Sequence, residues 1–219
     1  MRALVLGRGG IGAAFVRHLE PRGTVTVLSR QDGLDWERPE VAQECLVGAS
    51  ALGPFEVIVD ATGMLVWQDH LPEKRLEAIN AKAMAAQFAV NAIGPALVLK
   101  HYDRLLAPAG RSVFATLSAR VGSIGDNHLG GWISYRAAKA ALNQIVRTAS
   151  IEIARKRPDA IVVALHPGTV ATNLSSPFAG RRDTFTPDQS ARMLIDVLDG
   201  LTPRDTGQLY AYDGTRIPW

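Results

Sequence analysis

Short apolar runs alternate with longer amphipathic stretches along the whole chain. The apolar runs are rich in Val, Ile and Leu and end at Gly, Pro or polar residues, which is typical of buried strands. Strands are predicted at 3–6, 24–28, 57–60, 111–117, 161–165 and 208–212. Helices are predicted at 11–19, 39–50, 80–106, within 132–157, and at 186–198. Strands that alternate with helices predict a parallel sheet with helices on both faces.

Several helix boundaries carry local signals. Asn80 can accept the first free amides of a long helix that runs to about Leu106. Thr186-Pro187-Asp188-Gln189 combines an N-cap, a proline at the first helical position and a capping-box glutamine, and Gly200 follows as a stop signal. The sequence contains no repeat, low-complexity tract or linker. The expected fold class is α/β: one Rossmann domain over residues 1–219, with a doubly wound parallel sheet of about seven strands.

Composition and charge narrow the function. The chain has 219 residues, of which 47% are hydrophobic and 21% charged, as in an ordinary globular domain. Its net charge of +3 is spread out, and Arg155-Lys156-Arg157 is typical of a solvated helix end, so no nucleic-acid partner is expected. Cys45 is the only cysteine and has no His or Cys at ligand spacing, which predicts neither a disulfide nor a metal site.

Targeting signals are also not expected. The chain meets Gly7 too early for a signal-peptide core, and no run approaches 18 apolar residues. We therefore expect a cytoplasmic protein with no membrane partner.

A glycine-rich turn follows the first predicted strand and opens the first predicted helix. It reads Gly7-Arg8-Gly9-Gly10-Ile11-Gly12. Glycines allow positive φ and let a pyrophosphate approach backbone amides at a helix N-terminus. A lone motif of this kind is weak evidence, but its place between strand and helix predicts a dinucleotide site. A merely tight strand–helix turn is the alternative.

The end of the second predicted strand should bind the adenosine ribose. An acidic residue there favours NAD, and a basic one accommodates the 2′-phosphate of NADP. Ser29 and Arg30 stand there, and Arg8 can join them, which predicts NADP(H) as the preferred cofactor. Asp32 is the competing signal and keeps NAD(H) possible, although Asp32-Gly33 is also typical of a turn.

Tyr135 and Lys139 are four residues apart in a helix-forming stretch, so they share one helix face. An ammonium about 5 Å from a phenol, at an effective dielectric of about 20, favours the phenolate by roughly 3 kcal/mol. That is about two pKa units below the usual value of about 10. We therefore expect a tyrosine that exchanges a proton with a carbonyl or alcohol oxygen near neutral pH.

These motifs together resemble the short-chain dehydrogenase/reductase family along essentially the whole chain. The resemblance rests on the glycine turn, Asp60-Ala61-Thr62-Gly63, Asn91, Tyr135 with Lys139, and Pro167-Gly168-Thr169-Val170-Ala171-Thr172, which occur in the family's order. Within the family, Arg120-Val121-Gly122-Ser123-Ile124 and the ending Tyr212-Asp213-Gly214 resemble the C-factor-like group. The Gly-Arg-Gly turn is similar to that of dihydropteridine reductases.

The resemblance implies a role for each matching residue. Tyr135 would be the general acid/base, and Lys139 would lower its pKa and bind the nicotinamide ribose. Asn91 would sit at a break in its helix and hold a water that relays protons to Lys139. The other implied cofactor contacts are Pro167, Gly168, Val170 and Thr172 at the nicotinamide, Asp60, Ala61, Thr62 and Gly63 along the adenosine, and Asp35 at the adenine amino group. Two alternatives stay open: Asn91 as a satisfied buried polar group, and Asp35 as a turn former.

Two positions depart from the family pattern. Leu6 stands where the glycine turn usually begins, and Ala119 stands at the usual catalytic serine. Ser118 and Ser123 are the candidate replacements, with Ser118 preferred. Dihydropteridine reductases are similar in having an alanine there, so the missing serine does not exclude reduction.

The segment 171–185 would form a lid over a small-molecule carbonyl or alcohol substrate. It contains Leu174, Pro177, Phe178, Gly180, Arg181 and Arg182, and Trp132 and His128 are candidates for the opposite wall. The resemblance also implies a homodimer or homotetramer built on the helices of Asn91 and Tyr135. The main expectation is an NADP-dependent carbonyl reductase or alcohol dehydrogenase. The alternatives are a dihydropteridine reductase-like activity and a cofactor-binding regulatory or signalling protein without turnover.

Overall fold

A seven-stranded sheet forms the centre of the molecule in the computed structural model, which describes residues 1–175, 178 and 184–219. The order across the sheet is β2-β1-β3-β4-β5-β6-β7. All neighbouring pairs are parallel except β6 and β7. The strands are β1 (Arg2–Leu6), β2 (Thr24–Leu28), β3 (Val57–Asp60), β4 (Ser112–Leu117), β5 (Ala160–His166), β6 (Leu209–Ala211) and β7 (Arg216–Ile217). The predicted fold class is confirmed.

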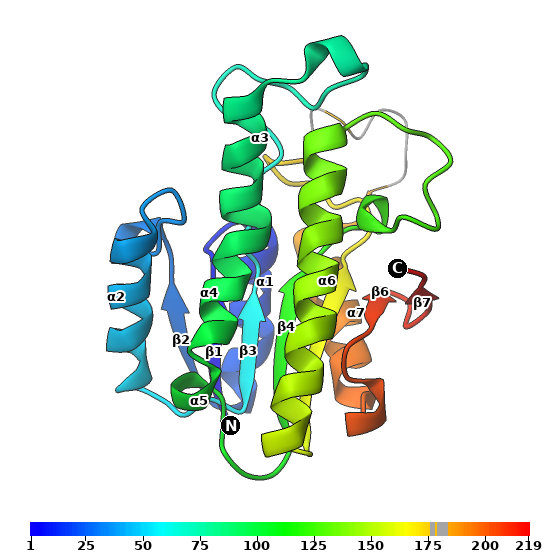
Figure 1. The fold of residues 1–219 in the computed structure, drawn as a ribbon. Helices are drawn as coiled ribbons and strands as arrows, with labels where there is room; N and C mark the ends of the chain where they lie inside the picture. The colour runs from blue at the N-terminus through cyan, green and yellow to red at the C-terminus, as the bar shows by residue number, and fades with distance from the viewer. Residues whose placement is uncertain (176–177, 179–183) are drawn as a thin grey trace.

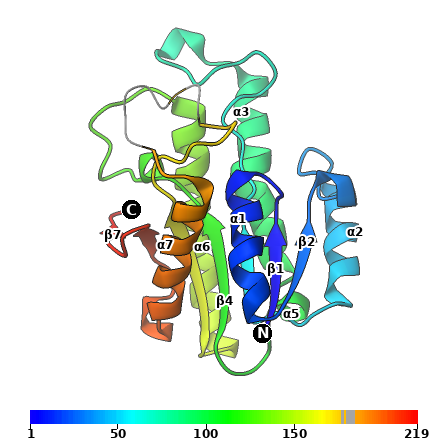
Figure 2. The same cartoon turned by 180° about the vertical axis from the view of Figure 1, so that it is seen from behind.

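Helices cover both faces of this sheet. One face carries α1 (Gly10–Leu19) and α7 (Pro187–Gly200), which lie against each other (Figure 2). The other face carries α2 (Pro39–Ser50), α3 (Ala81–Phe88), α4 (Gly94–Lys100), α5 (Tyr102–Leu105) and α6 (Ile133–Lys156) (Figure 1).

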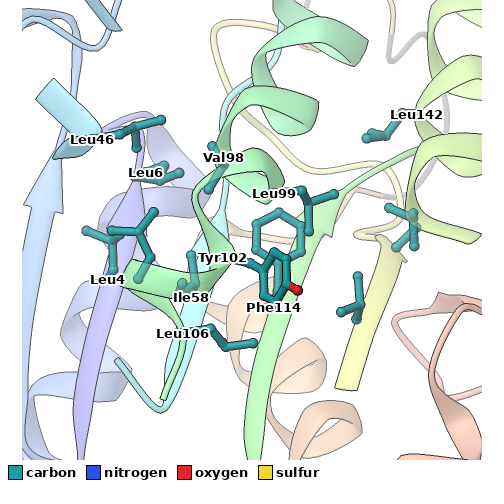
Figure 3. Close-up of a cluster of buried hydrophobic side chains, with 14 of the residues drawn as sticks. Leu4, Leu6, Leu46, Ile58, Val98, Leu99, Tyr102, Leu106, Phe114 and Leu142 are labelled. Atoms are coloured by element: carbon teal, nitrogen blue, oxygen red, sulfur yellow. The ribbon is translucent and has the colours of Figure 1, made fainter. Parts of the chain in front are cut away.

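Two hydrophobic clusters fill the layers between sheet and helices. Successive residues of a strand point to opposite faces. Leu4 and Leu6 of β1 therefore pack towards α2 and α4 (Figure 3), whereas Ala3 and Val5 pack towards α1 and α7. A sheet buried on both faces requires apolar residues at every strand position, which explains the continuous apolar runs of the sequence.

The helix predicted from residue 80 to 106 is interrupted. Asn80 caps α3 as expected, but a π-helical segment, η4 (Ala89–Ile93), separates α3 from α4, and His101 separates α4 from α5. Pro95 has no N–H, so the carbonyl of Asn91 cannot accept the ordinary α-helical hydrogen bond from it. This proline is the physical reason for the break.

Two further features were not predicted from the sequence. The first is β7, whose two residues are too few for an alternating pattern. The second is the helical run Ala81–Lys100, which is long and apolar enough to span a membrane, with a mean hydropathy of 1.3. Half of that window is buried inside the protein, as in a core helix.

The carboxyl ends of the parallel strands meet at one edge of the sheet. The glycine turn follows β1, Ser29 follows β2, and the β3–α3 loop (residues 61–80) follows β3 at this edge. In Figure 1 this is the upper end, above which α3 and α6 project. In open α/β sheets, ligands bind in the crevice beyond these strand ends.

Candidate active site

A cleft of about 900 Å³ runs along this edge from the glycine turn to α6. It brings together most of the residues that the sequence analysis proposed. These are Gly7, Arg8, Gly9, Gly10, Ile11, Gly12, Ser29, Arg30, Ala61, Thr62, Gly63, Ser118, Tyr135, Lys139, Pro167 and Thr172. Five proposed residues do not line it: Asp35, Asp60, Asn91, Gly168 and Val170.

The glycine turn leaves backbone amides open at one end of the cleft. Gly7 has φ +98°, and a Cβ on Gly12 would lie 2.2 Å from the carbonyl oxygen of Gly7. The N-cap of α1 is Gly9, which offers no side chain to the first amides of the helix. Leu6, in place of the family's glycine, is fully buried in β1. The turn therefore fits a phosphate group at a helix N-terminus.

Two arginines lie beside the turn, each near one carboxylate. Arg8 is 3.6 Å from Asp32, and Arg30 is 3.7 Å from Glu37. Both guanidinium groups are more than half exposed, so these ion pairs contribute little and either arginine can turn towards an anion.

Asp32 is held as a turn residue. Its carboxylate accepts hydrogen bonds from the backbone N–H and the hydroxyl of Ser29, at 2.9 and 2.8 Å. The bond from the Ser29 hydroxyl is the main cause that holds the pKa of Asp32 below its ordinary value. Gly33 then closes the turn at φ +94°.

Tyr135 and Lys139 occupy the other end of the cleft on one face of α6. Lys139 is only 3% exposed, and its Nζ donates to the carbonyl oxygen of Leu117 at 2.7 Å. Burial lowers the pKa of Lys139 to about 8, and the carboxylate of Asp60 opposes this change.

The expected low pKa of Tyr135 is wrong for this structure. Burial raises the pKa of Tyr135 to about 12. The shared helix face is real, but the Lys139 nitrogen lies over the ring, 5.8 Å from its centroid, while it bonds the Leu117 carbonyl. Desolvation of the phenolate therefore outweighs attraction to the ammonium.

Ser118 lines the cleft with Tyr135 and Lys139, whereas Ser123 does not line it. The hydroxyl of Ser118 donates to Oδ1 of Asn143 at 2.7 Å. Ser123 is buried and accepts from the N–H of Asp126. Asn143 was not predicted as a site residue, although it follows Tyr135 and Lys139 at the same spacing of four residues.

Asp60 and Asn91 are buried beneath the cleft rather than in its wall. Asp60 accepts from the N–H and hydroxyl of Thr62 and from the hydroxyl of Thr116. Its burial raises its pKa. The side chain of Asn91 bonds the N–H and carbonyl of Met64 and the amide oxygen of Gln87, at 3.0, 2.8 and 2.7 Å. Asn91 sits at a helix break as expected, but its amide fastens the β3–α3 loop, and the water relay stays a prediction.

The carboxylate of Asp35 accepts local hydrogen bonds in the turn before α2, as the turn-former alternative predicted. It accepts from the guanidinium of Arg38 and the N–H of Glu37, ahead of α2. Gly168, with φ +79°, lies against Phe185, and Val170 is buried. None of these three residues lines the cleft.

The substrate end contains only part of the expected lid. Ala171, Thr172, Asn173 and Leu174 line the cleft, whereas Pro177, Gly180, Arg181 and Arg182 lie outside the described residues. Trp132 stacks edge-on against both Tyr135 and Phe178, with ring centroids 6.2 and 5.6 Å apart. His128 is exposed and does not line the cleft. Trp132 does not line the cleft either, but its ring contacts Tyr135, which does.

The sequence analysis also missed apolar cleft residues that no motif marks. They are Leu34, Trp36, Met64, Leu65, Val66 and Val90. The Trp36 indole N–H donates to the hydroxyl of Thr62 at 3.1 Å.

Comparison with known proteins identifies the family of this chain. A family model described as enoyl-(acyl carrier protein) reductase matches residues 40–212. A 1-hydroxy-2-glutathionyl-2-methyl-3-butene dehydrogenase from Rhodococcus sp. (strain AD45) is 37% identical over 99% of this chain and 98% of its own length. The chain belongs to the short-chain dehydrogenase/reductase family. The C-signal protein of Myxococcus xanthus, 34% identical over 76% of this chain and 94% of its own length, is a second relative.

Solved structures of this family share the fold. The carbonyl reductase Sniffer of D. melanogaster has a TM-score of 0.84 at 20% identity and covers 100% of this chain and 99% of its own. An NADPH-bound carbonyl reductase from chicken fatty liver has a TM-score of 0.85 at 22% identity, covering 100% and 98%. The predictions of the family and of an oxidoreductase class are thus confirmed.

Proposed function

We propose that this protein is an NADP-dependent oxidoreductase that interconverts a carbonyl compound and its alcohol. The observation that carries the proposal is the order of groups in one cleft: open amides and two arginines at one end, and Tyr135, Lys139 and Ser118 at the other. NADPH bound along the cleft supplies the hydride from nicotinamide C4. The chain supplies binding, orientation and the proton.

Tyr135 is the proton donor in this scheme. With a pKa of about 12, the phenol is protonated at neutral pH, which suits reduction of a carbonyl. Lys139, with a pKa of about 8, is mostly protonated at pH 7 and stabilises the phenolate that remains. Ser118 is the candidate second donor to the developing oxyanion if its hydroxyl turns from Asn143, and such a donor contributes about 3–4 kcal/mol.

The substrate class follows from the walls of the cleft. The apolar lining includes Met64, Leu65 and Leu174, and the Trp132 ring packs edge-on against Tyr135, the phenol of the site. Apolar walls around few polar groups suit an aldehyde, ketone or quinone. The Rhodococcus relative is named for a glutathione-substituted alcohol, so we include such a bulky alcohol among the candidate substrates.

The first test is a screen of NADPH consumption with aldehydes, ketones, quinones and quinonoid pterins, and of NADP reduction with a glutathione-substituted secondary alcohol. Tyr135→Phe should keep NADPH binding and lose about 10²–10⁴-fold in kcat. Tyr102→Phe is the matched control, because Tyr102 is buried outside the cleft. Undiminished turnover by Tyr135→Phe would overturn the mechanism.

The second test concerns the cofactor. NADPH should bind at least about tenfold more tightly than NADH, a difference of about 1.4 kcal/mol. Arg30→Ala should remove most of that difference, whereas Arg104→Ala, on α5 away from the cleft, should not change it. Equal affinities in the unmutated protein would overturn the NADP assignment.

A regulatory protein that binds the cofactor without turnover is the second candidate. The likeness to the C-signal protein and the alanine at position 119 favour it. The buried Lys139 beside Tyr135 argues for chemistry, because a buried ammonium is costly and a binding protein has no need of it. NADPH binding with no turnover across the whole screen would favour the regulator.

A further inference from the structure

Glu73 is a buried carboxylate that the proposed mechanism does not use. It lies in the β3–α3 loop and is only 6% exposed. Its carboxylate accepts hydrogen bonds from both the backbone N–H and the hydroxyl of Ser134, which is 61 residues away in the sequence. Ser134 immediately precedes Tyr135. A carboxylate is rarely buried without such partners, so its position calls for an explanation.

The start of α6 has an unusual backbone. Gly130, Gly131 and Trp132 all have positive φ, at 63°, 66° and 53°. This conformation is easy for glycine but costly for a bulky residue such as tryptophan. Trp132 is also the N-cap of α6, and its side chain makes no capping hydrogen bond. The first turn of the helix must therefore be fixed by groups from outside it.

Two residues bond the backbone of this segment. Arg136 donates to the carbonyls of Gly130, Gly131 and Val121. Glu73 supplies the acceptors: its backbone carbonyl accepts from the N–H of Trp132, and its carboxylate caps Ser134. A carboxylate at a helix N-terminus is further stabilised by the helix dipole.

We propose that Glu73 is a positioning residue for catalysis: it caps α6 from the β3–α3 loop and thereby sets the places of Tyr135 and of Trp132, whose ring packs against Tyr135. The loop that carries Glu73 also carries the cleft-lining residues 61–66 and is held at Met64 by Asn91. Glu73 thus ties the cofactor side of the cleft to the helix that carries the proton donor. The inference rests on the proposed function, since it assigns a purpose to the placement of Tyr135.

The experiment compares Glu73→Ala, Glu73→Gln and Ser134→Ala with the unmutated protein, using NADPH and 9,10-phenanthrenequinone as the probe substrate. Glu73→Ala should lower kcat by at least about tenfold, because small displacements of a reacting group are costly. Its affinity for NADPH should stay within about twofold of the unmutated value. Glu73→Gln keeps an acceptor oxygen and should recover most of kcat. Ser134→Ala, which keeps the backbone bond, should fall between them.

Glu77→Ala is the matched control, because Glu77 is an exposed glutamate on the same loop and should leave kcat unchanged. A readout independent of turnover is amide hydrogen exchange at residues 132–136, which should quicken in Glu73→Ala and not in Glu77→Ala. Unchanged exchange there, an unchanged kcat, or a Glu73→Gln variant as impaired as Glu73→Ala would each overturn the inference. An inactive Tyr135→Phe beside a fully active Glu73→Ala would remove this inference alone, whereas an active Tyr135→Phe removes the proposed function.

Discussion

Lys139 is a charged side chain in a site that disfavours its charge. It is surrounded by protein, donates a hydrogen bond to the Leu117 carbonyl and has the buried Asp60 as an electrostatic partner. Burial of an ammonium costs free energy of folding, and its lowered pKa measures that cost. Sites that stabilise reactive groups often reduce the stability of the fold in this way.

The pH dependence of folding should report this cost. The pKa of Lys139 is about 8 in the folded protein, against the ordinary lysine pKa of 10.5 in the unfolded chain. Between these values the unfolded chain binds a proton that the folded protein does not, so the free energy of unfolding rises with pH. The gain over this window is about 3 kcal/mol, and below pH 8 it is absent.

Lys139→Met should therefore raise the free energy of unfolding at pH 7 and remove the rise between pH 8 and 10.5, while it abolishes turnover. Urea unfolding at several pH values measures both effects. Lys82→Met, at an exposed lysine on α3, should keep the rise. If the pH profile of Lys139→Met matches that of the unmutated protein, the burial cost assigned to Lys139 is wrong.

For single residues, the sequence predicts which side chains share a helix face better than it predicts their burial and pKa. The spacing of four correctly placed Tyr135 and Lys139 on one face, but spacing carries no information about desolvation, and the pKa of Tyr135 moved opposite to the expectation. Asp35 shows the same limit, since its carboxylate is used by Arg38 in a local contact that no motif marks.

The break between α3 and α4 places Asn91, whose side chain bonds the β3–α3 loop. Pro95 interrupts the helix, and Asn91 in η4 uses its whole amide to hold Met64 and Gln87. The proline was present in the sequence and could have predicted the break. The loop contact of Asn91 could not be predicted, because it joins residues far apart in the chain whose pairing depends on the assembled sheet.

Asn91→Ala should be strongly destabilising as well as inactivating. It leaves the backbone N–H and carbonyl of Met64 and the amide oxygen of Gln87 without these partners, and we expect a loss of about 2–4 kcal/mol in the free energy of unfolding. Asn80→Ala deletes the same amide at the cap of α3 and should cost about 1 kcal/mol with kcat unchanged. A residue that served only a proton relay would behave differently: Asn91→Ala would then lower kcat and leave unfolding unchanged.

For the whole molecule, prediction from sequence succeeded because local signals agree with one another. Apolar runs, caps and turn glycines all specify the same parallel sheet, and the family's motifs follow the carboxyl ends of its strands. What failed were features set by long-range contact. The contact between Glu73 and Ser134 depends on the packing of the β3–α3 loop against α6. The two residues are 61 positions apart in the sequence, so no motif spacing predicts their contact.

The outer faces of α4 and α6 form the surface on which we expect a second copy of the chain to dock. A groove of about 490 Å³ lies between them, with the apolar side chains of Leu99 and Ile145 and the small residues Ala96 and Ala149 in its lining. Small residues allow two copies to approach closely, and a stable dimer needs about 800 Å² buried on each partner. The interface would belong to the homodimer or homotetramer that the family resemblance implies.

Light scattering should accordingly give at least twice the chain mass of 23.6 kDa. Thr148→Arg places a long charged side chain in the groove and should shift the protein to the monomer. Asp196→Arg, exposed on α7 on the opposite face of the sheet, should leave the assembly intact. The monomer should still bind NADPH, because the cleft and the groove between α4 and α6 share no lining residue. A protein that is monomeric before mutation, or whose assembly persists in Thr148→Arg, does not use this surface.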